Sequence, residues 1–388
     1  MKNQKKIIYY WCPFTGNVAT INAVLNSIIS LKKYSNGDYQ PCLINVVGEW
    51  DNKKEFLKEK KINVINFRST NIINYLPKLG FFKSRFTYFI IFFLSVLKLH
   101  KILKKNQPDF LVIHLITFIP LFLILFNKYK TKFILRISGY PKLNLIRKIL
   151  WKIINYKIYL ITAPTRTTLN YLVSNKIFKS DKIVYLPDPV LKIKKIQKKK
   201  RENNRVESQL SKINSLISIG RLTKQKNFGF LIDAFFEIQK KYTNLNLFIL
   251  GEGEERKNLE KKINQLNLTN KVFLVGYKKN IYDYLKNSKI FILSSLWEDP
   301  GFVLLEAGYL NKIIFSSDCP NGPIEILNNG NNGFLYKSNL KENFVKNFDK
   351  LLNCENSIIY KKKINLKIKC KEFTMFNHYQ ELKNILNQ

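Results

Sequence analysis

Residues 214–235 read NSLISIGRLTKQKNFGFLIDAF and contain, in order, the three parts of a strand-to-helix unit. An apolar run of strand length comes first, a segment with the apolar spacing of a helix comes last, and the turn between them carries Arg221 and Lys226. A strand that is buried on both faces of a parallel sheet shows such a continuous apolar run. The stretch therefore predicts a parallel α/β unit with two cations at the carboxyl end of its strand.

The same alternation of strand-like and helix-like segments runs through the whole chain, which is typical of doubly wound α/β folds. The other strand-like runs are 6–12, 41–48, 110–115, 132–138, 158–163, 182–186, 245–253, 271–277, 289–295 and 312–318. Residues 192–212 interrupt them with a polar, charge-dense stretch. With 388 residues, the chain is too long for one ordinary core. We expect two Rossmann-like domains facing each other across a cleft, at 1–190 and 213–365, joined by a linker at 191–212.

The net charge of +39 limits the classes of partner. Between Lys60 and Lys179 the chain carries 22 lysines and arginines, and Asp109 is its single acidic residue. Such an excess attracts nucleic acid, anionic lipid or phosphorylated substrates. A general enrichment in Lys, Asn and Ile would produce the same charge without any selected partner, and the sequence leaves both explanations open.

The sequence contains only three histidines, and its five cysteines each stand alone, at Cys12, Cys42, Cys319, Cys354 and Cys370. This distribution argues against a zinc site or a disulfide framework and favours a reducing, cytoplasmic environment. The basic N-terminus has too short an apolar run to predict a signal peptide.

Two apolar patches raise the question of a membrane segment. Residues 86–97, FTYFIIFFLSVL, are too few to cross a bilayer. Residues 110–126 are near the lower limit, but His114, Thr117 and Pro120 interrupt them. We interpret the second patch as a buried strand followed by a packed helix, with membrane insertion as the alternative.

Residues 294–307, SSLWEDPGFVLLEA, place Glu298 and Glu306 eight positions apart. On one continuous helix these positions would lie about 80° out of phase, so a shared helix face is a poor explanation. Pro300 and Gly301 favour a break, with Glu298 in a strand-to-helix loop and Glu306 in the helix that follows. Free amides at the helix start can bind an anion, and the two carboxylates could converge on one ligand.

Three other loops follow predicted strands. Gly16 lies in the first one, PFTGN, where either a phosphate-binding loop or a plain turn fits a single glycine. Gly251 and Gly253 imitate a dinucleotide fingerprint, but Arg256 replaces its third glycine, so we expect a tight turn instead. Residues 316–336 form a loop rich in Gly, Asn and Pro that could wrap a ligand or simply connect two elements.

The segments GRLTKQKN, WEDPGFVLLEA and SDCPNGPIEILNNGNNGFLY together resemble glycosyltransferase family 4, whose members are retaining nucleotide-sugar transferases of the GT-B fold. The resemblance is strongest over 215–340. The phrases PDFLVIHL, FILRISGYPK and LITAPTRTT are also similar to members that build bacterial surface polysaccharides and lipid-linked glycans. The resemblance implies that the last segment, 366–388, is a helix that crosses back to the first domain.

The family's E-x7-E motif falls on Glu298, which would face the transferred sugar, and Glu306, which would hold the ribose. Arg221 and Lys226 match its diphosphate-binding pair. The resemblance also implies that His114 contacts the donor sugar, although a satisfied core histidine is an equal alternative. The implied catalytic residues are Glu298, Arg221, Lys226 and His114, and the implied donor-binding residues are Glu306, Gly301, Phe302, Val303 and Gly16. The glycine loop near Gly16 is poorer than is common in the family.

We therefore expect a retaining transferase that moves a hexose or N-acetylhexosamine from a UDP-linked donor to a glycan or polyprenyl-linked acceptor, in polysaccharide, lipopolysaccharide or capsule synthesis. No D-x-D motif follows a predicted strand, so no metal and no cofactor beyond the nucleotide-sugar co-substrate is expected. The cationic, aromatic-rich first half favours peripheral attachment to the anionic inner face of the cytoplasmic membrane. The competing hypothesis is a basic nucleic-acid- or membrane-binding protein with a vestigial enzyme core, but no nucleic-acid module is recognisable and no nucleic-acid partner is expected.

Overall fold

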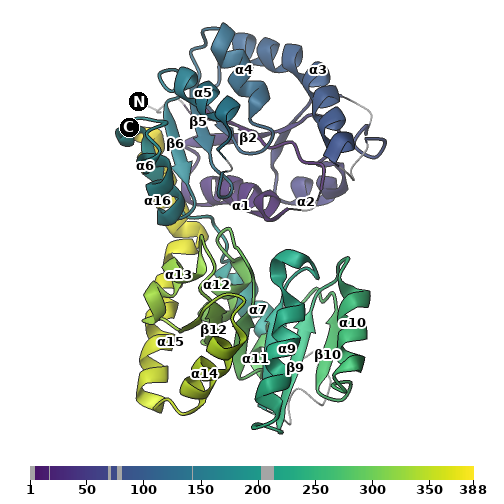
Figure 1. Cartoon of the computed structure of the whole chain (residues 1–388). Coiled ribbons are helices and arrows are strands. Elements are labelled where there is room, and N and C mark those ends of the chain that lie inside the picture. Colours follow the sequence, from purple (N-terminus) through teal and green to yellow (C-terminus); the bar gives the residue numbers. More distant parts are fainter. Residues whose placement is uncertain (1–4, 17, 69–70, 77–80, 142, 202–213) are drawn as a thin grey trace. The chain divides into compact units, whose positions relative to one another are not determined.

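The chain forms two compact units (Figure 1). The computed structural model describes residues 5–16, 18–68, 71–76, 81–141, 143–201 and 214–388. Unit 1 comprises Met1–Pro189 and Met375–Gln388, and unit 2 comprises Val190–Thr374. Each unit holds a sheet of parallel strands between helices, so the predicted class of two Rossmann-like α/β domains is confirmed. That the domains face each other across a cleft stays a prediction.

Unit 1 contains a seven-stranded sheet in the order β3-β2-β1-β4-β5-β6-β7. Its strands are β1 Lys6–Trp11, β2 Tyr39–Asn45, β3 Asn63–Asn66, β4 Phe110–Ile113, β5 Lys132–Arg136, β6 Leu160–Ala163 and β7 Ile183–Tyr185. Its helices are α1 Ala19–Tyr34, α2 Lys54–Glu59, α3 Phe81–Asn106, α4 Phe118–Phe126, α5 Leu145–Ile154, α6 Arg166–Ser174 and α16 Met375–Asn387. The strand order reverses between β1 and β4, which makes this pair the switch point of the unit.

Unit 2 contains a six-stranded sheet in the order β10-β9-β8-β11-β12-β13. Its strands are β8 Asn214–Ile219, β9 Leu245–Leu250, β10 Val272–Gly276, β11 Ile290–Leu293, β12 Ile313–Ser317 and β13 Phe334–Tyr336. Its helices are α7 Ile193–Arg201, α9 Phe228–Gln239, α10 Arg256–Gln265, α11 Tyr282–Asn287, α12 Phe302–Tyr309, α13 Pro323–Ile326, α14 Lys341–Leu352 and α15 Asn356–Cys370. Here the order reverses between β8 and β11.

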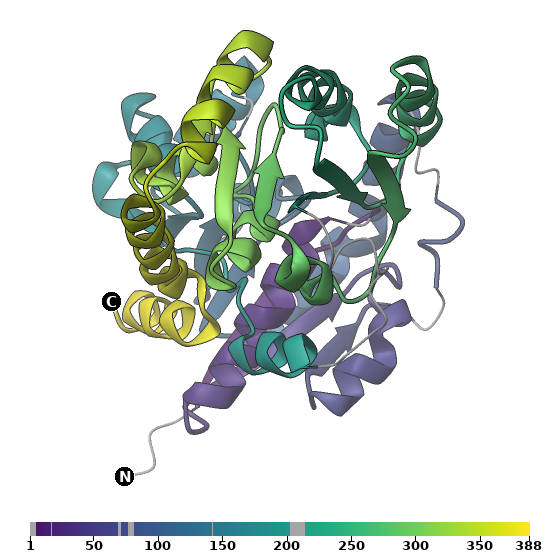
Figure 2. The same cartoon turned by 90° about the horizontal axis from the view of Figure 1, so that it is seen from below.

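Both sheets are buried on their two faces, which explains why their strands read as continuous apolar runs. In unit 1, Tyr9 and Trp11 pack under α3, α4 and α5, while Ile8 and Tyr10 pack under α1 and α16. In unit 2, α9, α10 and α14 cover one face, and α7, α11, α12 and α15 cover the other (Figure 2). The side-chain alternation of a strand therefore supplies two cores from one apolar run.

Several boundaries differ from the sequence-based expectation. The predicted linker at 191–212 contains the helix α7, whose Ile196 is buried in the core of unit 2. The rest of the predicted linker, 202–212, lies outside the described residues. The helix that returns to unit 1 starts at Met375 rather than at 366, since 366–370 still belong to α15. The edge strands β3 and β13 were not predicted, because β3 has only two apolar residues between asparagines and β13 directly follows the Gly- and Asn-rich stretch 328–333.

The two apolar patches also have definite structures. Residues 110–126 form β4 and the helix α4, as predicted. The patch at 86–97 lies within the longer helix α3. The prediction that the apolar segment is too short to cross a bilayer therefore does not hold for the helix that contains it. Within the described residues, Phe86–Asn106 is the one stretch whose 21-residue length and mean hydropathy of 1.7 would allow a membrane crossing, a test that core helices of soluble proteins also pass.

Candidate active site

The switch point of unit 2 brings together residues that are far apart in the sequence. Strand β11 pairs directly with β8, with Ile290 opposite Leu216. The helices that follow these strands, α9 and α12, then leave toward opposite faces of the sheet. Rossmann-like units bind ligands where strand-end loops diverge in this way. The loop after β8 carries Arg221 and Lys226, and the loop after β11 carries Glu298.

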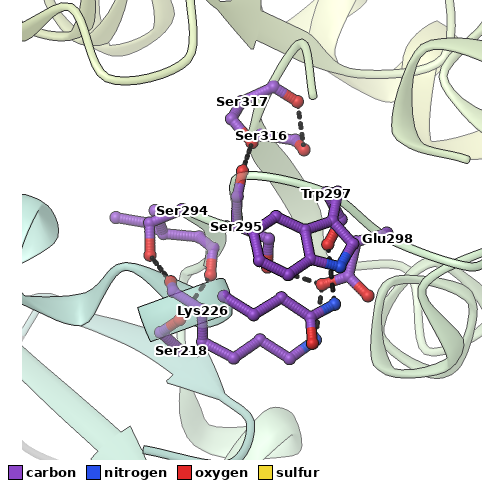
Figure 3. A network of polar contacts seen from close by, with 10 residues as sticks. Ser218, Lys226, Ser294, Ser295, Trp297, Glu298, Ser316 and Ser317 are labelled. Carbon is purple, nitrogen blue, oxygen red and sulfur yellow. Dashed lines mark hydrogen bonds and ion pairs between the residues drawn. The ribbon is translucent and has the colours of Figure 1, made fainter. Parts of the chain in front are cut away.

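Lys226 and Glu298 form an ion pair at this switch point (Figure 3). The Lys226 Nζ lies 2.5 Å from the Glu298 Oε1, and the two side chains are only 17% and 6% exposed. The Ser295 hydroxyl donates to the same Oε1, also at 2.5 Å. Within the described residues, Oε2 of Glu298 accepts no hydrogen bond. One carboxylate oxygen is thus held by the protein, and the other can accept a hydrogen bond from a ligand hydroxyl.

Backbone hydrogen bonds tie the two loops together around this pair. Ser294 Oγ donates to the Lys226 carbonyl at 2.8 Å, and the Leu296 amide donates to the Gln225 carbonyl at 2.9 Å. The Gln225 side-chain amide donates to the Trp297 carbonyl at 2.9 Å. Because each bond joins the β8 loop to the β11 loop, the ion pair is fixed by backbone as well as by side chains.

The loop after β12 supports the same site from the other side. Ser317 Oγ donates to the Ser295 carbonyl at 2.7 Å, and the Asn321 side-chain amide donates to Asp299. Gly322 has φ +150°, and a Cβ there would lie 2.1 Å from the Pro300 carbonyl oxygen. Only glycine allows this approach. The loop at 316–336, which the sequence left as a ligand-wrapping or connecting segment, therefore packs against the Pro300 turn.

Glycines also bring the β9 loop against the β8 loop. A Cβ at Gly251 would lie 1.8 Å from the Gly220 carbonyl oxygen, and one at Gly253 would lie 2.3 Å from the Leu222 carbonyl oxygen. The Leu222 amide donates to the Glu252 carbonyl at 3.0 Å. These contacts agree with the predicted tight turn and give the glycines a packing role.

The side chains of Arg221 and Lys226 take different positions. Arg221 is exposed. Lys226 folds back over Gly220, where a Cβ would lie 3.2 Å from three carbons of the lysine side chain. The structure places both cations at one strand end, with Lys226 held by its partner and Arg221 facing solvent.

Glu306 lies in α12, and Glu298 lies in the loop before it, so the predicted break at Pro300 and Gly301 is confirmed. Gly301 precedes the helix with φ +99°, which favours glycine. Phe302 and Val303 form the first turn and are partly exposed.

The Glu306 carboxylate accepts a hydrogen bond from the Tyr282 hydroxyl at 2.8 Å. Burial raises the pKa of Glu306, while this hydrogen bond and the charge of Lys195 oppose the shift. Tyr282, on α11, thus orients the Glu306 carboxylate.

The other two candidates, His114 and Gly16, lie in unit 1, after β4 and β1 at its switch point. The His114 ring is buried against Tyr10, and among the described residues neither ring nitrogen has a hydrogen-bond partner. Burial lowers the pKa of His114 well below its usual value, and the nearby charges of Arg136 and His378 act in the same direction. The described residues do not satisfy the ring as the core-histidine alternative expects, and the contact of His114 with the donor sugar stays a prediction.

His114 and Arg136 line a hollow of about 760 Å³ within unit 1. Gly16 lies in an exposed loop, where a Cβ would meet nothing within 4 Å. Its neighbour Asn17 lies outside the described residues. Nothing in the local geometry requires a glycine at this position.

Sequence reasoning missed Ser294, Ser295 and Tyr282, which hold the two loops and the two glutamates. The two serines directly follow an apolar strand, and this position was the available signal for them. Tyr282 lies on a separate short helix, so no local pattern connected it with Glu306.

Comparison with known proteins connects this geometry with sugar transfer. Residues 200–368 match the family model described as Glycosyl transferases group 1. An uncharacterized glycosyltransferase of Methanocaldococcus jannaschii is 38% identical over 252 residues, which cover 59% of this chain and 60% of that protein. The Campylobacter jejuni N-acetylgalactosamine-N,N'-diacetylbacillosaminyl-diphospho-undecaprenol 4-alpha-N-acetylgalactosaminyltransferase is 29% identical over 192 residues, half of each chain. The chain thus matches about half to three fifths of these relatives' lengths.

Solved structures resemble both units. A glycosyltransferase from Rickettsia africae superposes with a TM-score of 0.77 at 17% identity, covering 99% of this chain and 98% of the other. Anabaena HepE in complex with UDP gives a TM-score of 0.72 at 15% identity, covering 99% and 100%. The likeness confirms the predicted GT-B fold class. At this level of identity it concerns the fold alone.

Proposed function

We propose that the protein is a retaining glycosyltransferase that moves a hexose or N-acetylhexosamine from a UDP-linked donor to a glycan or lipid-linked acceptor. The observation that carries the proposal is the Lys226–Glu298 pair, fixed where β8 and β11 end, inside the segment that matches glycosyl transferases group 1. A cation and a carboxylate at one switch point suit a ligand that combines a diphosphate with a sugar.

The cations would act on the leaving group. Arg221 offers a bidentate fork and Lys226 a point charge, and Lys226 pairs with Glu298 in the loop that leads into α12, whose free amides favour an anion. As the bond from the anomeric carbon to the diphosphate breaks, negative charge grows on the departing oxygen and these groups stabilise it. The acceptor oxygen bonds to the anomeric carbon on the same face, and its proton passes to the departing phosphate. The charge of these side chains makes a metal unnecessary in this scheme.

The two glutamates would divide the recognition of the donor. Among the described residues one oxygen of Glu298 has no hydrogen bond, and it would accept a hydrogen bond from a sugar hydroxyl. Glu306 is oriented by Tyr282 and would accept from the ribose hydroxyls. We expect loss of Glu298 chiefly to slow transfer and loss of Glu306 chiefly to weaken nucleotide binding.

We propose that unit 1 binds the acceptor. Its hollow of about 760 Å³ lies at the carboxyl ends of β4 and β5 and is lined by both apolar side chains and the polar His114 and Arg136. An amphipathic, lipid-linked glycan fits such a lining. The relative from Campylobacter jejuni, named for an undecaprenol-linked substrate, supports this acceptor class.

A nucleotide-sugar panel tests the proposal directly. The purified protein is incubated with UDP-, GDP- and ADP-linked sugars with and without EDTA, and free nucleotide and the thermal midpoint are measured. We expect UDP-sugars alone to raise the midpoint and release nucleotide, with EDTA having no effect, and the product's anomeric configuration by NMR to match the donor's. Failure of every nucleotide sugar to bind or react would overturn the assignment.

Variants then test the division between the glutamates. Glu306→Ala is expected to raise the Kd for UDP about tenfold or more, while Glu298→Gln keeps the Kd and lowers kcat. Glu254→Gln, a change of an exposed glutamate in the loop after β9, serves as the matched control. Unchanged UDP affinity in Glu306→Ala would contradict the ribose assignment.

A further inference from the structure

Exposed apolar side chains gather on three helices of unit 1. In the described part of the chain, 25 large apolar side chains are exposed, and 12 of them lie on α3, α4 and α5. They are Phe86, Tyr88, Phe89, Phe93, Leu97, Phe118, Phe122, Phe126, Leu145, Ile146, Ile149 and Ile153. We call these residues the apolar face. Isolated exposed apolar residues are ordinary on soluble proteins, whereas a contiguous patch marks an interaction site.

Helix α3 shows how the apolar face arises. Its buried stripe, Thr87, Ile91, Ser95, Leu99 and Leu103, repeats every four residues and packs into the core of unit 1. Phe89 and Phe93, on the outward side, are 59% and 60% exposed. The helix is therefore apolar on both sides, and burial in the core explains only one of them.

The three helices form one continuous surface. The ring of Phe92 on α3 stacks on that of Phe118 on α4, with 5.9 Å between the ring centroids. Its centroid lies 5.2 Å from that of Phe122. Tyr88, Phe118 and Ile146, one from each helix, also line the hollow that contains His114. Figure 1 shows α3, α4 and α5 lying together over the same sheet. The apolar face thus borders the proposed acceptor cavity.

Positive charge accompanies this face. Lys98, Lys101, Lys105 and Lys128 are exposed on or next to α3 and α4, and Arg147 and Lys152 are exposed on α5. From Lys60 to Lys179 the only carboxylate is Asp109. Aromatic and aliphatic side chains flanked by lysines match a bilayer, in which an acyl region lies beneath a layer of anionic headgroups.

We propose that α3, α4 and α5 form a membrane-docking surface that binds the anionic bilayer with the helices lying along it. The surface goes beyond the proposed enzymatic function and does not depend on it. Docking leaves Ile91, Leu99 and Leu103 in the core of unit 1, whereas a membrane-crossing α3 would remove them from it. Helix α3 also ends in KLHKILKKN, residues 98–106, whose lysines suit a headgroup layer better than an acyl interior.

Vesicle flotation tests the docking surface without any sugar donor. The full chain is mixed with vesicles of phosphatidylglycerol and phosphatidylethanolamine, or with vesicles of phosphatidylcholine alone, at low and high salt. We expect binding to the anionic vesicles only, falling at least fivefold at high salt. Bound protein should be released by alkaline carbonate, since a docked protein does not span the bilayer.

The variant Phe89→Glu/Phe93→Glu is expected to lower the bound fraction at least tenfold, and Lys101→Glu/Lys105→Glu to remove its salt dependence. The matched control is Tyr277→Glu/Tyr360→Glu, which places two charges on exposed aromatic positions of unit 2 (75% and 66% exposed). Circular dichroism and the thermal midpoint check that each variant folds.

Three outcomes would overturn the proposal. Resistance to carbonate would indicate a spanning α3. An equal loss in the control variant would assign binding to overall charge. Concentration-dependent dimers that Phe89→Glu/Phe93→Glu dissociates, without vesicle binding, would make the apolar face an interface between copies of the chain. Since no donor is used, these results are independent of whether the sugar-transfer assignment holds.

Discussion

Polar residues near the carboxyl ends of the strands have different surroundings in the two units. In unit 2, Lys226 and Glu298 lie in strand-end loops, and Glu298 keeps one oxygen without a hydrogen bond. In unit 1, Arg136 pairs with Asp188 at 2.6 Å, and the arginine also donates to the Leu186 carbonyl at 2.6 Å. The Arg136 side chain is 3% exposed.

The buried network of unit 1 extends to the C-terminal helix. His378 of α16 contacts the Pro187 carbonyl oxygen at 2.7 Å through Nδ1 and Ser27 Oγ at 2.9 Å through Nε2. Tyr10 contacts the same serine hydroxyl at 3.0 Å. This network therefore holds α16 on its unit, whereas we propose that the charged pair of unit 2 faces a ligand. Ion pairs near strand ends can thus have different surroundings in the two units.

Removing Arg136 should have the largest effect on stability. In Arg136→Met, the Asp188 carboxylate loses its partner, and leaving one member of a buried pair unpaired costs about 4 kcal/mol of unfolding free energy. Urea unfolding measures this loss. The exposed Arg166→Met, whose guanidinium only covers the Tyr185 ring, should cost less than about 1 kcal/mol. Equal losses in the two variants would contradict the structural role of the unit 1 network.

Removing Lys226 should lower turnover. We expect Lys226→Ala to lower kcat about 100-fold or more, since a positioned charge on a leaving group is worth roughly 3 kcal/mol. Lys224→Ala removes an exposed charge from the same turn and should leave kcat within about twofold. Steady-state kinetics with the best donor of the panel provide the measurement. If both lysines mattered equally, general positive charge rather than the ion pair would be responsible.

The histidine network makes unit 1 sensitive to acid. Burial lowers the pKa of His378 to about 4 from the ordinary 6.5, so the unfolded chain takes up a proton that the folded chain refuses. The stability from the neutral ring is fully present above pH 6.5 and is lost as the pH falls toward 4, by about 3 kcal/mol in total. His114 acts in the same direction.

Between pH 6.5 and 4, the free energy of unfolding of His378→Gln should therefore fall by about 3 kcal/mol less than that of the parent protein. Urea unfolding at each pH measures this difference. Glu49, whose pKa burial raises to about 7, opposes the trend, because its contribution is lost as the pH rises from about 4.5 to 7. Glu49 is present in both proteins, so it cancels in the difference. Parallel pH profiles would show that His378 is not buried in neutral form.

The smallest expected effect on stability concerns two loop glycines, Gly253 and Gly16. Gly253→Ala places a Cβ 2.3 Å from a backbone oxygen of the β8 loop, so we expect a loss of about 2 kcal/mol in unfolding free energy. Gly16→Ala meets nothing within 4 Å and should change stability by less than about 0.5 kcal/mol. Thermal unfolding of both variants decides whether the loops of unit 2 are as rigid as their contacts indicate.

Much of the fold followed from local pattern. The long apolar runs predicted β1, β2, β4 to β7 and β8 to β12, since a strand buried on both faces leaves a clear signal. The edge strands β3 and β13 left none. The length of α3 was also missed, because its last third alternates lysines with apolar residues that only the packed core identifies as buried.

The sequence by itself determined which chemistry stands at each strand end: cations after β8, a carboxylate after β11, and a second carboxylate in α12. These assignments follow from local rules of turn, break and helix. The three-dimensional fold was needed to show that Lys226 and Glu298, 72 residues apart, form a pair, whereas His114 is buried with no hydrogen-bond partner among the described residues. The reason is strand order, because pairing β11 beside β8 is a long-range choice that no local pattern encodes.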